Sequence, residues 1–435
     1  MTEGERYATR DEAEAVELAA GRFFLPNTPI SVKELFSGRR TQIRLLLDTV
    51  HQPGLHAAVF GERGVGKTSL ANIVKPLLDV GGAEGGKAML AVRVPLNSAD
   101  DFSSAWYKAF GELTVPIPGM GFKPAAGSRT SLAAEFFSNK RISIDAVRRT
   151  LADIGDSVFV FDEFDRLPRD VTKAFTDLIK CVSDYTLPAT IVIVGVSETI
   201  DALIEDHNSI TRSLTQIHMP RMPSDELRAI LEKGEQRLGV RFEDYAADFI
   251  VKMSQGLPHY THLIGQCSVR TACQRMSRVI SREDVEASCN KTVESAQHHT
   301  MMSGYSIAIR SSHRDALYAH VLLACAIAAS RSIDELGYFQ PTSVIEPLQA
   351  ILPKRRIQHG TFDGHLSEFC DERRSGILER TGAPRSYRYR FADPLMPSFV
   401  MLQGLARALI DSDTLRGLLR SVDPPTAPSG QEVHL

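Results

Sequence analysis

One short segment, Gly61-Glu62-Arg63-Gly64-Val65-Gly66-Lys67-Thr68, constrains the fold of this chain more than any other. It fits the pattern GxxxxGK[ST] completely, and it stands between an apolar run at 56–60 and a helix-forming run at 69–74. A phosphate loop needs this context, because glycines let backbone N–H groups turn toward a polyphosphate and the helix N-terminus adds partial positive charge. We therefore predict a nucleoside triphosphate site over Gly61 to Ser69. Lys67 would reach the β- and γ-phosphates, and the Thr68 hydroxyl would ligate Mg²⁺.

A second motif, which is acidic, is the pair Asp162-Glu163 directly after the apolar run at 157–161. A carboxylate at the end of a strand can hold Mg²⁺, so Asp162 is predicted as a metal ligand together with Thr68. Glu163 is predicted to polarise the attacking water, and Asp165 to have a structural role. The two motifs together predict ATP hydrolysis.

Buried β-branched runs separated by helical stretches indicate a parallel α/β sheet. The expected strands lie at 56–60, 88–94, 157–161, 190–194 and 216–219. After the fourth of them, Ser197 either contacts the γ-phosphate or the attacking water, or caps a helix that begins near Thr199. A Pro/Gly-rich insert at 111–128 is expected to be a surface loop.

Strand signals fade after Ser224, where four stretches have helical apolar spacing: 225–238, 243–254, 258–275 and 282–297. Ser303-Gly304 marks an expected break. Beyond it, helices at 313–330, 342–352 and 361–374 and a hairpin over 377–391 predict a winged helix. The expected domains are an N-terminal extension (1–29), a nucleotide-binding core (30–222), a helical lid (223–300), a winged-helix domain (305–405) and a disordered Pro/Ser-rich tail (412–435).

Composition excludes a global attraction to nucleic acid, because 50 Lys and Arg face 53 Asp and Glu and the formal net charge is −3. Any surface for double-stranded DNA must be local. The candidates are the basic residues before the presumed recognition helix, an early residue of that helix and three arginines of the wing: Lys354, Arg355, Arg356, Thr361, Arg385, Arg388 and Arg390. The alternative is a winged helix that contacts protein. The charged N-terminus and the lack of an apolar run of about 18 residues predict a cytoplasmic protein with no membrane contact.

The order of these motifs resembles the AAA+ ATPases. Ser37-Gly38-Arg39-Arg40, Phe161-Asp162-Glu163-Phe164-Asp165 and the final winged helix look most like the initiator clade of origin-recognition and cell-division-cycle ATPases, and are also similar to the STAND switch ATPases. The resemblance implies that Gly38 and Arg39 line the adenine pocket. It also implies that Arg212, before the fifth strand, reaches the γ-phosphate of a neighbouring subunit in an ATP-dependent oligomer.

The chain departs from the AAA+ pattern at Gln255-Gly256-Leu257-Pro258-His259, where most lids carry a sensor arginine. The Gly-x-Pro turn is similar to STAND ATPases. Pro258 and His259 are the candidate nucleotide contacts of the lid, and a structural role for His259 stays open. Without the arginine we expect slow hydrolysis and a long-lived ATP state.

The resulting prediction is a Mg²⁺-dependent ATPase switch that couples ATP or ADP binding to oligomerisation and DNA association. Two alternatives share the same core. One is a STAND-type signalling or defence ATPase, whose winged helix mediates autoinhibition or protein contact and whose N-terminal segment meets a partner. The other is a transposition-helper ATPase.

Overall fold

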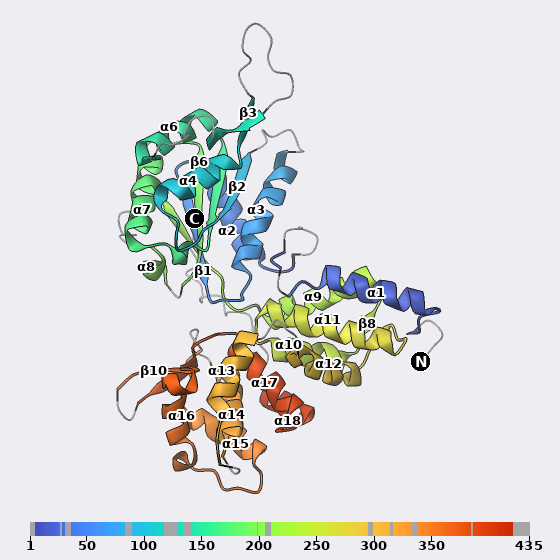
Figure 1. Cartoon of the computed structure of the whole chain (residues 1–435). Helices are drawn as coiled ribbons and strands as arrows, with labels where there is room; N and C mark the ends of the chain where they lie inside the picture. The colour runs from blue at the N-terminus through green and yellow to red at the C-terminus, as the bar shows by residue number, and fades with distance from the viewer. Residues whose placement is uncertain are drawn as a thin grey trace, which may run out of the picture. The chain divides into compact units, whose positions relative to one another are not determined.

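The computed structural model divides into two compact units (Figure 1). The first consists of Pro29–Glu62 and Gly66–Met219, and the second of Met1–Thr28, Arg63–Val65 and Pro220–Leu435. The predicted division into core, lid and winged-helix domain is finer than this and stays a prediction. The structure describes residues 5–26, 28–30, 36–82, 89–116, 129–133, 141–197, 199–204, 210–294, 299–313, 316–332, 334, 337–383 and 386–420.

The first unit is built on a five-stranded parallel sheet, as the sequence predicts. Its strands are β1 (His56–Gly61), β2 (Leu90–Pro95), β5 (Ser157–Asp162), β6 (Ala189–Val196) and β7 (Leu214–His218), in the order β2-β5-β6-β1-β7. All six residues of β1 and all six of β5 are buried, which explains why these strands are continuous apolar runs rather than alternating ones. The phosphate-loop strand and the Asp-Glu strand therefore end at the same edge of the sheet.

Helices cover both faces of this sheet (Figure 1). The helices α4 (Phe102–Gly111), α6 (Ile144–Ile154) and α7 (Arg169–Asp184) lie on one face, and α3 (Lys67–Gly82) lies on the other with α2 (Arg40–Val50). The core of the first face surrounds the fully buried Trp106, whose ring centroid is 5.0 Å from that of Phe161 and 6.3 Å from that of Phe175. A short helix, α8 (Ile200–Leu203), follows β6.

The Pro/Gly-rich insert is not a plain loop throughout. Its start forms strand β3 (Thr114–Pro116), which pairs antiparallel with β4 (Arg129–Ser131). The rest of the predicted loop, 117–128, lies outside the described residues.

The second unit contains the four helices predicted after Ser224: α9 (Ser224–Leu238), α10 (Asp244–Ser254), α11 (Pro258–Gln274) and α12 (Arg282–Glu294), with the two-residue strands β8 (Arg241–Phe242) and β9 (Val279–Ile280). The N-terminal helix α1 (Arg10–Phe23) packs on α9 and α11. Phe24 is fully buried, and a Cβ added at Gly234 would lie 2.6 Å from its ring. The N-terminal segment is thus part of the packed unit.

The C-terminal part follows the predicted order of helices and hairpin, with shorter elements. It comprises α13 (His299–Ile309), α14 (Tyr318–Ser330), α15 (Ile345–Ile351), α16 (Asp363–Phe369), β10 (Leu378–Thr381), β11 (Arg388–Phe391), α17 (Met396–Ala406) and α18 (Ser412–Leu418). The hairpin is confirmed, because β10 and β11 pair antiparallel.

Two expectations for this part are wrong. Ser303-Gly304 does not break the chain, because α13 runs through it. Residues 412–418 are not disordered, because Asp411 caps α18 and Leu415 buries its side chain completely. The remainder of the predicted tail, 421–435, lies outside the described residues.

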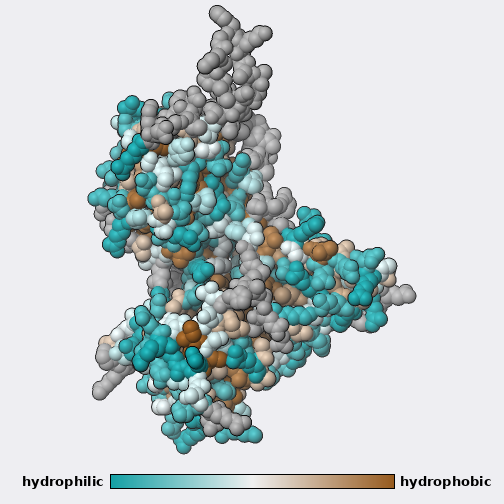
Figure 2. Space-filling model, viewed as in Figure 1, coloured by the Kyte–Doolittle hydropathy of each residue, from teal (hydrophilic) through white to brown (hydrophobic). Residues whose placement is uncertain are grey.

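Most of the coloured surface in Figure 2 is hydrophilic, and hydrophobic residues show on that face only as small patches. None of the helices formed by the described residues is both long enough and apolar enough to cross a bilayer.

Candidate nucleotide-binding site

The phosphate loop joins β1 to α3 and depends on its glycines. A Cβ added at Gly61 would lie 2.4 Å from the carbonyl oxygen of Met219, which no side chain tolerates. Gly64 and Gly66 have φ values of 88° and 98°, a region open to glycine but strained for other residues. The loop therefore has a backbone conformation that requires glycine at these three positions.

Lys67 begins α3 with its ammonium group turned back onto the loop. Its Nζ donates to the carbonyl oxygens of Gly61, at 2.9 Å, and Glu62, at 2.7 Å. Burial lowers the pKa of Lys67 to about 8, against the opposing attraction of Asp165 and Asp162. The side chain is a desolvated cation whose hydrogen-bond partners are neutral carbonyls, which suits it to exchange them for phosphate oxygens.

Asp162, at the end of β5, is the central acid of the site and is 2% exposed. Its Oδ1 accepts a hydrogen bond from the Glu163 backbone N–H at 3.0 Å and lies 3.5 Å from the Thr68 hydroxyl. Its Oδ2 accepts from the Arg93 Nη2 at 2.6 Å. Arg93 escaped the sequence analysis, although a lone arginine inside the β2 run Leu90–Pro95 is the signal that could have found it.

Glu163 has an unusual backbone for its residue type, with φ 61° and ψ 36° in the left-handed region. A non-glycine residue there costs about 1–2 kcal/mol, and such strain gathers at functional sites. Its side chain is 44% exposed and lies 3.2 Å from Arg166. The carboxylate is thus accessible to water, in contrast to that of Asp162.

Asp165 and Ser197 connect the acidic motif to the end of β6. Asp165 Oδ1 accepts the Val196 N–H at 2.7 Å, which supports the predicted structural role. The Ser197 hydroxyl donates to the Thr199 carbonyl at 2.6 Å, and the N-cap of α8 is Thr199 itself. Ser197 therefore does not cap the helix, and its contact with phosphate or water stays a prediction.

The segment expected to line the adenine pocket precedes α2. Gly38 and Arg39 have φ values of 70° and 61°, so two successive residues are left-handed. Arg39 is only 2% exposed, which its sequence context does not suggest. On the helix that follows the loop, the Ser69 hydroxyl accepts the Ile30 N–H at 3.1 Å, so a hydrogen bond joins Ile30 to α3.

Four other predicted residues are placed as follows. Arg212 is exposed in the turn before β7, with no ion-pair partner in the described part of the chain. Arg63, which belongs to the second unit, lies 3.4 Å from Asp393. Pro258 is the first residue of α11, and His259 Nδ1 donates a hydrogen bond to the Pro26 carbonyl oxygen at 2.7 Å. Burial lowers the pKa of His259, which favours a neutral ring. A structural role for His259 explains both the burial and the hydrogen bond to Pro26.

Some of the predicted DNA-contact residues are exposed, and others already form ion pairs or hydrogen bonds within the chain. Lys354, Arg355 and Arg356 are exposed. Arg388 forms an ion pair with Asp334 at 2.9 Å, and Arg390 forms one with Glu379 at 2.8 Å. The Arg390 side chain is only 23% exposed, so it does not face solvent fully. The Thr361 hydroxyl caps its own turn by accepting the Gln358 N–H. Arg385 lies outside the described residues.

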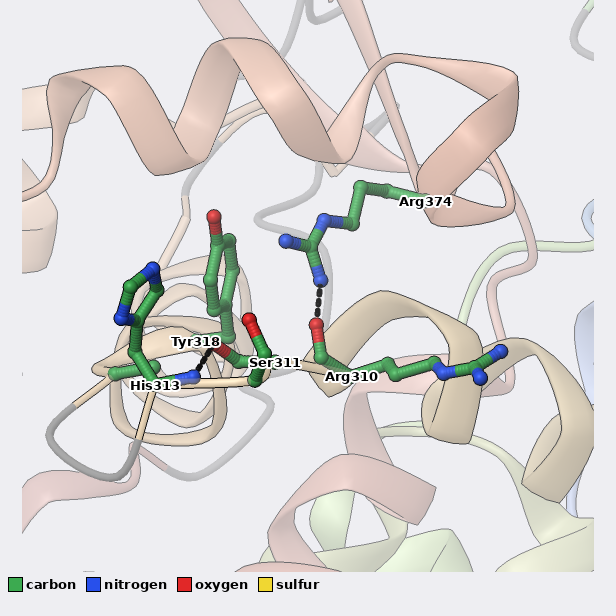
Figure 3. Close-up of a pocket in the computed structure, with 7 residues that line it drawn as sticks. Arg310, Ser311, His313, Tyr318 and Arg374 are labelled. Atoms are coloured by element: carbon green, nitrogen blue, oxygen red, sulfur yellow. Dashed lines mark hydrogen bonds between the residues drawn. The ribbon is translucent and has the colours of Figure 1, made fainter.

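Figure 3 shows a polar hollow in the C-terminal part that contains none of these predicted contacts. Its guanidinium, from Arg374, donates to the Ala308 carbonyl at 3.1 Å and to the Arg310 carbonyl, and lies 3.7 Å over the Tyr318 ring. These contacts close the C-terminal end of α13, so a structural role explains this arginine.

The oxygen atoms at the phosphate loop suit a small hard cation. Mg²⁺ prefers hydroxyl, carboxylate and phosphate oxygens, and it commonly binds with few protein ligands and several waters. Thr68 and the buried Asp162 could each supply one oxygen ligand to such a cation. Within the described residues no group of three or more His, Cys, Asp or Glu could hold a metal by itself, so bound phosphates would have to complete this site.

A phosphate loop on β1, an Asp-Glu pair on β5 and a five-stranded parallel sheet define a P-loop nucleoside triphosphatase. Residues 30–279 match the family described as Novel STAND NTPase 1, and the chain belongs to that family. No curated protein matches the sequence.

Solved structures resemble the chain at low identity. A Walker-type ATPase of Pyrococcus abyssi is 14% identical over 87% of this chain and 99% of its own, with a TM-score of 0.49. The ORC1 protein of Aeropyrum pernix, solved in complex with DNA, is 16% identical over 89% and 97%, with a TM-score of 0.45. The RuvB branch migration motor of Thermotoga maritima is 17% identical over 84% and 95%, with a TM-score of 0.43.

Proposed function

We propose that this chain is a switch that binds Mg²⁺–ATP at the Lys67–Asp162 site, hydrolyses it slowly and self-associates in the ATP-bound state. The observation that carries the proposal is the presence of two buried groups at one edge of the sheet. One is the Lys67 ammonium, whose hydrogen-bond partners among the described residues are the Gly61 and Glu62 carbonyls, and the other is the Asp162 carboxylate beside the Thr68 hydroxyl. Together they offer the positive charge and the oxygen ligands that a Mg²⁺–triphosphate requires.

Each remaining residue has a role in this proposal. Glu163 orients and deprotonates the attacking water, because its carboxylate is accessible and adjoins the metal ligand. Arg212 stabilises the γ-phosphate of a neighbouring copy, a role that its exposed position before β7 supports. The first turn of α11 begins with Pro258 and His259 rather than arginine, which favours slow turnover.

The mass of the protein in solution tests this proposal. Light scattering after size exclusion should show a larger species with Mg²⁺ and a non-hydrolysable ATP analogue than with Mg²⁺ and ADP. Lys67→Ala should abolish the difference, because it removes the phosphate-binding cation. Lys75→Ala, at an exposed position of the same helix, should behave like the wild type. Identical masses in both nucleotides would refute nucleotide-controlled self-association.

A second candidate function, DNA association, is favoured by the three consecutive exposed cations at 354–356. Phosphate contacts of this kind are sequence-independent and weaken as salt rises. Replacing all three with glutamine should lower the affinity for duplex DNA about tenfold or more at low salt. The pair Arg388→Gln and Arg390→Gln should have a smaller effect, because acidic residues already engage both side chains. Failure of the wild-type protein to bind DNA at 50 mM salt would exclude this function and favour protein contact.

A further inference from the structure

The ion pair between Arg93 and Asp162 occupies the carboxylate that should bind Mg²⁺. Arg93 Nη2 lies 2.6 Å from Asp162 Oδ2, a distance typical of a strong charge-assisted hydrogen bond. The carboxylate is 3% exposed and the guanidinium 33%, so solvent screens the pair poorly on the acidic side. Removal of a single partner from such a pair leaves an uncompensated buried charge.

The sheet register explains how the pair forms. Arg93 is opposite Val160 and Pro95 is opposite Asp162 in the parallel β2–β5 ladder. Arg93 and Pro95 therefore point to the same face, and the long arginine side chain reaches along β2 to the carboxyl end of β5. The neighbouring Val92 and Val94 face the buried core on the opposite side.

The donors around Asp162 leave Mg²⁺ little room. Oδ1 already accepts from the Glu163 N–H and lies near the Thr68 hydroxyl, whereas Oδ2 has Arg93 as its partner. The Arg93 Nε is buried without a hydrogen-bond partner among the described residues. Within the described part of the chain, the guanidinium therefore has one hydrogen bond, from Nη2 to this carboxylate, and no second acceptor.

We propose that the Arg93 guanidinium competes with Mg²⁺ for Asp162 of the same chain, a role that we call the gate. Arg93 neutralises Asp162 in the metal-free state and must release Oδ2 when Mg²⁺ enters with the nucleotide. Arg93 is then a positioning residue that sets the Mg²⁺ concentration needed for nucleotide binding. This inference rests on the proposed function, since it assumes a Mg²⁺–nucleotide at this site. It predicts that Mg²⁺ competes with the guanidinium for the same oxygen.

A Mg²⁺ titration of nucleotide binding tests the gate without measuring turnover. The probe is a fluorescent, non-hydrolysable ATP analogue, and the readout is the free Mg²⁺ concentration that gives half-maximal anisotropy. Arg93→Gln should lower that concentration about threefold to tenfold, because the competing cation is gone and the buried carboxylate is left unpaired. Arg149→Gln is the matched control, because Arg149 forms an exposed ion pair with Asp145 in the same unit.

Each outcome bears on one of two claims. A wild-type protein that binds the analogue equally well with and without Mg²⁺ would overturn the metal part of the proposed function and the gate with it. A Mg²⁺-dependent wild type with an unchanged or higher half-saturating concentration in Arg93→Gln would overturn the gate alone. If Arg93→Gln does not fold, Arg93→Lys carries the same test. Lysine keeps the charge but loses the planar donor group, so a smaller decrease supports the gate and no decrease refutes it.

Discussion

Histidine at position 56 shows how one buried side chain can set the pH dependence of the first unit. His56 is fully buried at the start of β1, and its Nδ1 accepts the Ile191 N–H at 2.9 Å. Nε2 therefore carries the proton, and it has no hydrogen-bond partner among the described residues. Burial lowers the pKa of His56 to about 3. The native state thus holds a neutral ring that the unfolded chain would protonate near pH 6.5.

The sign of the pH effect follows from these two values. Because the native state excludes the proton, the contribution of His56 to stability is complete above pH 6.5 and falls as the pH drops toward 3, by about 1.4 kcal/mol per pH unit. We expect the first unit to lose about 2 kcal/mol between pH 7 and pH 5 from this residue alone. His56→Asn keeps an acceptor for the Ile191 N–H but does not titrate, so its urea midpoint should vary less over that interval.

Urea unfolding followed by tryptophan fluorescence measures this effect, since Trp106 lies in the same unit. His51→Asn is the control, because His51 is exposed at the end of α2. Parallel pH profiles for His56→Asn and the wild type would show that His56 does not cause the pH dependence.

Among the elements, α1 shows packing whose partners only the tertiary fold identifies. Phe24 follows this helix and lies against Phe23, with ring centroids 4.8 Å apart, and against the glycines of α9 and α11. The Phe24 carbonyl accepts from the Gln266 side chain at 2.7 Å. The glycines at 234 and 265 leave the room that the ring fills.

Truncation of this contact should destabilise the helical unit. Phe24→Ala leaves a cavity among α1, α9 and α11, and the free energy of unfolding of that unit should fall by about 3–5 kcal/mol. Leu18→Ala, on the same helix at 70% exposure, should change it by less than about 0.5 kcal/mol. Hydrogen exchange of the α11 amides measures both variants. Equal protection in the two would mean that α1 does not contribute to the stability of the unit.

The elements also show which parts of the structure a sequence can predict. The five strands, the four helices after Ser224 and the hairpin were predictable because local periodicity and glycine patterns specify them. The phosphate loop and Asp162-Glu163 were predictable because their chemistry demands contiguous residues. Arg93 and the buried Arg39 were not, because their roles depend on strands and turns that only tertiary folding brings together. Residues 412–418 form a short helix rather than the predicted disordered tail, because Asp411 caps it and Leu415 is buried, whereas the prolines lie farther along the chain.

At the scale of the whole molecule, the single tryptophan makes one unit separately observable. Trp106 lies in the core of the first unit, so its fluorescence reports that unit and not the second. A ligand that binds only the folded state stabilises it, by about 2.7 kcal/mol at a hundredfold excess over its Kd. Mg²⁺ and ADP should therefore raise the tryptophan-detected melting temperature of the wild type and leave that of Lys67→Ala unchanged. An equal rise in both proteins would place the nucleotide elsewhere.

The separation of ATP binding from ATP hydrolysis tests the central claim most directly, and Glu163→Gln achieves it. The variant keeps Lys67, Thr68 and Asp162, so it should bind one ATP per chain with wild-type affinity. It loses the carboxylate that activates water, so phosphate release should slow by about a hundredfold or more. A Glu112→Gln control, at the exposed end of α4, should hydrolyse ATP at the wild-type rate. Turnover by Glu163→Gln at the wild-type rate, or failure of the wild-type protein to bind ATP, would contradict the account.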